Sequence, residues 1–138
     1  MSNLVTLETK WNGAAVKIQG RKVVNKSAWE TGLIVEGQAK VLSPEDTGRL
    51  AASITTQSLT QGTIPNGSGA VPTDLISKPR DPQEVLVGTP VFYGPYMEFG
   101  TIKTDAQPFL RPALDLAKGK TLNILEFNGK FYLKEYLK

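Results

Sequence analysis

The sequence of 138 residues contains no cysteine and no histidine. Without cysteine the chain has no disulfide, no thiol nucleophile and no zinc-thiolate site. Without histidine it lacks the commonest general base near neutral pH and the commonest metal ligand, which excludes Ser-His-Asp, Cys-His and histidine-metal chemistry. The two absences together predict a protein that is not an enzyme and that needs neither a cofactor nor a metal ion.

Long apolar runs are missing as well, and the residues up to Trp11 show no charged start followed by an apolar block. We therefore expect no membrane span, no secretory signal and a protein that stays in the cytoplasm where it is made. Hydrophobic residues at 40% and charged residues at 21% are ordinary values for a globular protein. A chain of this length predicts one domain, residues 1–138, with one modest core.

Charge of one sign is in small excess, with a formal net charge of +3. This basic balance is compatible with a position near nucleic acid but is too weak to indicate binding, and a solvated surface is the favoured interpretation. No glycine-rich phosphate loop stands between a predicted strand and helix. The acidic residues near dense motifs have local roles, at a helix start for Glu45 and Asp46, on short helices for Glu98 and Asp115, and in a turn for Asp105. No catalytic, cofactor-binding or metal-binding residue is therefore predicted.

The pattern from about Asn12 to Leu42 predicts one long helix, because apolar residues recur at spacings of seven and eleven that return to the same side. Such a helix is about 45 Å long, which exceeds the size of a compact domain of this mass. Its apolar residues fall on two sides, where a surface helix needs one. Either both sides pack within the monomer, or the helix breaks near Asn25, or one side packs on a partner. The two sets are Trp11, Ile18, Trp29 and Leu33, and Val16, Val23, Ile34 and Val41.

Two short strands are expected in the middle of the chain, at Ser53 to Leu59 and Glu84 to Val91, because of their threonines, branched residues and alternation. A serine-proline-acid motif at 43–46 predicts a short helix through Leu50 just before the first strand. Between the strands, residues 61–83 are rich in proline and glycine, which predicts a long flexible arm that projects from a hairpin.

The last third of the chain predicts a short helix that ends at Gly100 and a second helix that ends at Gly119. Asn128-Gly129 between apolar segments predicts a C-terminal hairpin, an extension over residues 120–138. The fold class is accordingly α+β: a long N-terminal helix on a small antiparallel sheet with short helices, a long loop between two central strands, and this hairpin. The hairpin's apolar face requires cover from the body or from another subunit.

Three segments of the chain occur in the order and spacing of a known family. They are SPEDTGRLAASI at 43–54, VGT with YGPYMEFGT within 87–101, and QPFLRPAL at 107–114. They resemble the tail-component family of lambdoid phages, whose members are neck, head-tail joining or tail-completion proteins. The matching positions are Thr47, Gly48, Leu50, Ser53, Tyr93, Tyr96, Glu98, Phe99, Gly100, Thr101, Pro108, Phe109 and Pro112.

The resemblance implies a virion protein without catalytic activity that assembles as a ring between head and tail in the host cytoplasm. Its implied partners are further copies of itself, the head-closure or connector proteins, and the tail terminator or tail tube protein, with packaged DNA close by. We expect the matched residues to maintain the fold: glycines 48 and 100 permit turns, aromatics 93, 96, 99 and 109 fill the core, and prolines 108 and 112 set the entry to the last helix.

Other functions compete with the neck role. A tail terminator or minor tail protein has a similar size, and a nucleic-acid-binding module is a more distant alternative that only the basic balance favours. The unexplained apolar side of the long helix and the apolar face of the expected hairpin predict a subunit interface, for which the candidates are Val16, Val23, Ile34, Phe131 and Leu133.

Overall fold

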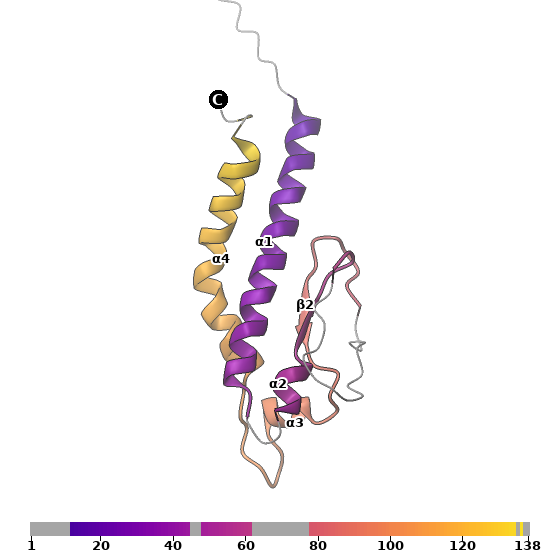
Figure 1. Ribbon diagram of the computed structural model, residues 1–138, viewed down its shortest axis with the longest axis vertical. Coiled ribbons are helices and arrows are strands. Elements are labelled where there is room, and N and C mark those ends of the chain that lie inside the picture. Colours follow the sequence, from indigo (N-terminus) through magenta and orange to yellow (C-terminus); the bar gives the residue numbers. More distant parts are fainter. Residues whose placement is uncertain (1–11, 45–47, 62–77, 135, 137–138) are drawn as a thin grey trace, which may run out of the picture.

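The computed structural model describes residues 12–44, 48–61, 78–134 and 136 (Figure 1). It confirms an α+β fold with a long N-terminal helix, short helices and a small antiparallel sheet. The elements are α1 (Gly13–Leu42), α2 (Arg49–Ser53), β1 (Thr55–Gln57), β2 (Leu86–Gly88), α3 (Gly94–Phe99) and α4 (Leu110–Leu133).

Helix α1 is continuous, so the prediction of one long helix is confirmed and the alternative of a break near Asn25 is wrong. It begins where the side chain of Asn12 accepts a hydrogen bond from the N–H of Ala15 at 3.3 Å. It ends at Ser43, whose N–H donates to the carbonyl of Ala39 at 2.9 Å. Trp11, predicted on one of its apolar sides, lies outside the described residues.

Helix α4 runs antiparallel beside α1 over much of its length, and the pair extends past the sheet and the short helices (Figure 1). The predicted C-terminal hairpin is therefore wrong, and so is the helix end at Gly119. The reason lies in Asn128, which is 1% exposed and donates from Nδ2 to Ser27 Oγ at 3.1 Å and to Glu30 Oε2 at 2.8 Å. Tertiary contact with α1 overrides the local turn preference of Asn-Gly.

Strands β1 and β2 form an antiparallel sheet of two strands within the described residues, with Thr56 opposite Val87. They confirm the two predicted central strands, in shorter form. The sheet packs on α1 at Gly32, where an added Cβ would come within 2.7 Å of Val85 Cγ1. Thr56 also donates to Glu36 Oε2 at 2.6 Å. Residues 62–77 of the predicted arm lie outside the described residues, so its mobility stays a prediction.

The core lies where α1, α2, the start of α4 and the segment before α3 meet. Its buried residues are Val35, Ala39, Leu50, Ile54, Val91, Phe109, Ala113 and Ala117. Phe109 is fully buried and Tyr93 packs partly against the core, as expected. The expectation that Tyr96 and Phe99 also fill it is wrong. Both side chains are exposed, because α3 packs on the core through Gly94 and Glu98, and Tyr96 and Phe99 lie on other sides of that helix.

Candidate functional site

The start of α4 is held by a side chain from another helix. Helix α4 has no side-chain cap of its own. Instead the carboxylate of Glu98 on α3 accepts hydrogen bonds from the N–H groups of Phe109, Leu110 and Arg111 at 2.8, 2.9 and 3.0 Å. These N–H groups have no acceptor within their own helix, and a carboxylate also favours the positive end of the helix dipole. Glu98 therefore fixes where α4 begins relative to α3.

The protonation of Glu98 reflects this contact. Burial raises the pKa of its carboxyl group, but the three backbone N–H donors and the nearby Arg111 charge outweigh that effect and leave the pKa below the ordinary 4.5. Glu98 is consequently ionised near neutral pH, in the state that accepts all three bonds. Its arrangement is that of a structural cap, because both carboxylate oxygens accept hydrogen bonds from backbone N–H groups at the start of α4.

The turn after α3 brings the second and third matched segments together. Gly100 has a φ of 77°, and an added Cβ there would lie 2.8 Å from the backbone nitrogen of Ala106. The following residues fold back through a bond from the N–H of Thr101 to the carbonyl of Thr104 at 2.8 Å. The N–H of Gln107 then donates to the carbonyl of Met97 at 2.8 Å. The expectation that Gly100 permits a turn is confirmed.

The first matched segment joins the same unit. Leu50 is buried in the core, and the hydroxyl of Ser53 donates to the carbonyl of Leu50 at 2.6 Å and lies 2.5 Å from Thr89 Oγ1. Gly48, with a φ of 68°, starts α2 as a turn residue. Thr47 lies outside the described residues. The structure thus gathers the three segments around one core, and Pro108 and Pro112 flank the start of α4 as expected.

This unit carries an exposed apolar surface, which we call the α3 surface. It consists of Phe92, Tyr96, Phe99 and Ile102, all large apolar side chains that are more than half exposed. Phe99 is 63% exposed, and the guanidinium of Arg111 lies 4.8 Å from its ring centroid. Large apolar groups gathered in this way on a small chain are typical of a binding surface.

Helix α4 exposes a second apolar surface, the α4 stripe, made of Leu116, Phe127 and Phe131. Their spacings of eleven and four place them on one side of the helix. Phe127 is 71% exposed. Phe131, expected at an interface on a hairpin, is thus available on a helix, whereas Leu133 is half-buried.

The candidate interface residues on α1 are less accessible. Val23 is only 5% exposed, Ile34 packs against the core, and Val16 is half-buried. Val23 and Ile34 are used inside the chain, whereas Ile18, Leu33 and Val41 of the two sets are 56%, 40% and 78% exposed. Packing within the monomer therefore accounts for the two apolar sides of α1 only in part. Val23 and Ile34, which the sequence predicted at a subunit interface, are therefore not part of the surface proposed below.

An apolar groove of about 650 Å³ separates β2 from α4. Its floor comes from α1, one wall from the segment that enters β2, and the other wall from α4. The lining residues are Ala28, Thr31, Gly32, Val35, Gln83, Glu84, Val85, Leu86, Val87, Leu110, Arg111, Leu114 and Thr121. Within the described residues, Thr31 Oγ1 is buried and has no hydrogen-bond partner.

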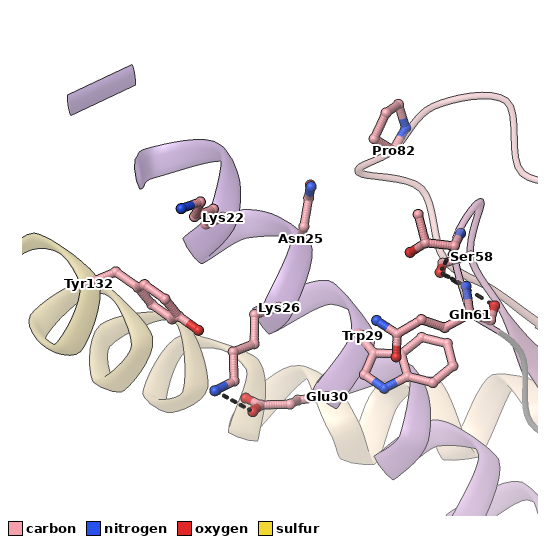
Figure 2. A pocket seen from close by; sticks show the side chains of 10 residues that line it. Lys22, Asn25, Lys26, Trp29, Glu30, Ser58, Gln61, Pro82 and Tyr132 are labelled. Atoms are coloured by element: carbon pink, nitrogen blue, oxygen red, sulfur yellow. Dashed lines mark hydrogen bonds and ion pairs between the residues drawn. The ribbon is translucent and has the colours of Figure 1, made fainter. Parts of the chain in front are cut away.

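A smaller and more polar pocket of about 490 Å³ lies nearer the N-terminal half of α1. Figure 2 shows Lys26, Trp29 and Glu30 of α1 between Tyr132 of α4 and the residues that follow β1. Lys26 is already engaged, with Glu30 at 4.0 Å and the Tyr132 ring at 5.5 Å. The hydroxyl of Ser58 is bound in its own turn by the N–H of Gln61 at 3.1 Å. That hydroxyl is thus engaged in its own turn, and the pocket offers polar and aromatic contacts.

Among the residues that the structure describes, no three acidic side chains gather in a way that could hold a metal ion, and no helix is long and apolar enough to cross a membrane. Comparisons of the chain with models of protein families, with curated proteins and with solved structures find no match.

The role of Glu98 was missed from the sequence. Glu98 lies in the second matched segment, and the N–H groups that it binds lie eleven to thirteen residues later, in the third. This spacing between the two segments was the available sequence signal.

Proposed function

We propose that this chain is a structural protein of a tailed bacteriophage virion, and that its copies form a ring at the joint between head and tail. Two supports are independent of each other. The three matched segments resemble the tail-component family, and in the folded chain they form one connected unit around the Glu98 cap. Sequence motifs that define a fold are expected to pack together, and these three segments do so.

The observation that carries the proposal is the apolar surface that the chain leaves exposed. The α4 stripe and the groove lie on different sides of α4, because Leu116 follows Leu114 of the groove wall by roughly 200° around the helix. Two different surfaces on one subunit permit a head-to-tail contact, which generates a closed ring when the rotation is right. Exposed patches of this kind are uncommon on monomeric proteins.

The test is the mass and shape of the purified protein, by light scattering and negative-stain electron microscopy. We expect rings for the natural chain and smaller species for Phe127→Asp, because a charge replaces an apolar side chain of the α4 stripe. Arg49→Asp is the matched control, since it places the same charge on an exposed polar position of α2, which belongs to neither the α4 stripe nor the groove lining. A natural chain that stays monomeric at all concentrations would contradict the proposal.

The place of the ring in the virion needs a genetic test. A lysate from phage that lack this gene should contain DNA-filled heads and separate tails, seen by electron microscopy. Empty unpackaged shells would assign the protein to an earlier step and contradict the joint. Complete heads with tails of abnormal length would favour the tail-terminator alternative.

A further inference from the structure

We infer that the groove between β2 and α4 receives an extended segment, residues 4–11, from a second copy of this chain, which adds to β2 as a third strand. The inference rests on the proposed function in one respect, namely that copies of the chain assemble. It adds how one subunit is tied to the next. The argument has three parts: the edge of β2, the shape of the groove, and the reach of the segment.

One of the two edges of strand β2 is available for pairing with a further strand. Strand β1 occupies the other edge, with Thr55 opposite Gly88 and Gln57 opposite Leu86. The strand-side wall of the groove comes from residues 83–87 and includes nothing from β1. The edge of β2 that has no partner strand within the described residues therefore borders the groove. Alternate N–H and C=O groups on such an edge point outward and bind an added strand.

The groove has room for the side chains of that strand. Its floor is built from small residues of α1, Ala28 and Gly32, and Leu114 forms the opposite wall. Thr31 Oγ1, buried without a partner in the described part of the chain, offers a hydrogen bond to an incoming backbone group. An unpartnered hydroxyl in an apolar site is costly, so an occupant with backbone polar groups fits better than a purely apolar one.

Residues 4–11 have the sequence that such a site selects, LVTLETKW. Val5 and Leu7 share one side of an extended chain, and Thr6 and Glu8 share the other. Branched and apolar residues in alternation with polar ones are typical of a strand with one buried face. The side with Val5 and Leu7 fits the apolar floor of the groove. The side with Thr6 and Glu8 then lies beside Leu86. Leu86 points away from α1, because its neighbours Val85 and Val87 point toward Gly32.

The segment of the same chain is too short to reach the site. Strand β2 lies over Gly32, and Gly32 is about 30 Å along α1 from Asn12. Leu7 is five residues before Asn12, so it extends at most about 17 Å from it. In a neighbouring subunit whose α1 lies parallel to this one and level with it, the segment falls short of the groove by the same distance. The donor's α1 must therefore be inclined or inverted relative to the acceptor's α1.

The test uses the absence of natural cysteine. A tagged full-length chain with Thr6→Cys is mixed with an untagged one with Leu86→Cys and is oxidised. Side chains directly opposite on paired strands lie about 5 Å apart at Cβ, close enough for a disulfide after small adjustment. We expect a tagged-untagged dimer from this mixture. The control partner is Gln57→Cys, which lies opposite Leu86 on β1 and away from the groove; it should give none.

Two further measurements make the result decisive. Leu7→Asp in the Thr6→Cys chain should lower the yield of dimer by about tenfold or more, because a charge would enter the apolar groove. A chain with both cysteines that cross-links to itself at high dilution would overturn the inference in favour of its own segment. Circular dichroism verifies that each variant is folded.

Light scattering on the same samples separates this inference from the proposed function. Rings without the mixed cross-link overturn the inference and leave the ring intact as a proposal. Samples that give neither rings nor cross-links overturn both. A cross-link from Leu86→Cys to a different protein in phage particles, with none between copies, also overturns it.

Discussion

Removal of the Glu98 carboxylate tests the link between α3 and α4 most directly. Glu98→Ala leaves the N–H groups of Phe109, Leu110 and Arg111 without their acceptor. Hydrogen bonds to charged groups are worth more than neutral ones, and Phe109 is fully buried, so water replaces the acceptor poorly there. The N–H groups of Leu110 and Arg111 are less enclosed and can bind water instead, which recovers part of the lost free energy. The expected destabilisation is about 3–5 kcal/mol.

The assay is urea unfolding at neutral pH, followed by circular dichroism and by intrinsic fluorescence. Glu98→Gln should lose less than Glu98→Ala, because the amide oxygen still accepts from part of the set while the charge is gone. Glu126→Ala is the control, since Glu126 is an exposed carboxylate on α4 that pairs with Lys130 at 2.6 Å; it should leave the midpoint unchanged. A loss below about 1 kcal/mol for Glu98→Ala would refute the reasoning, because it would equal an ordinary surface change.

The remaining predictions concern pH, packing and backbone. Because the folded pKa of Glu98 lies below its ordinary 4.5, its contribution to stability is present above that value and is lost as the pH falls through the lowered pKa; Glu98→Ala should flatten the acid side of a thermal-melting series. Gly32→Ala should cost about 1–3 kcal/mol in urea unfolding, because the new methyl group would lie 2.7 Å from Val85 Cγ1; no loss would mean that the sheet can move off α1. Asn128→Ala should cost about 2 kcal/mol by removing two bonds to α1, and an unchanged midpoint would contradict its role between the helices. Gly100→Ala should lower the melting temperature clearly, because it combines a positive φ with a backbone clash, whereas Gly119→Ala, with open space around it, should not.

Local patterns were sufficient for α1, α3, the two short strands and the presence of α2, whereas Ser43, expected to begin that short helix, ends α1 and α2 begins only at Arg49. Helical spacing over thirty residues survives the weak positions at Gly20 and Asn25, since the apolar phase is repeated many times. Gly48 and Gly100 could also be recognised, because a positive φ is a property of a few neighbouring residues. The same locality explains the misassigned C-terminus: Asn-Gly prefers a hairpin turn when nothing else acts on it.

The tertiary structure decided the features that depend on residues far apart in the chain. Asn128 lies in a helix because its amide meets Ser27 and Glu30 about a hundred residues earlier. Tyr96 and Phe99 are exposed because α3 packs on the core through Gly94 and Glu98. The sequence by itself determined the helix phase, the positive-φ glycines and the chemistry that the chain lacks, since each is set by residue type and local spacing. The partners of a side chain across the core, and the surfaces that remain exposed, follow only when the elements are packed together.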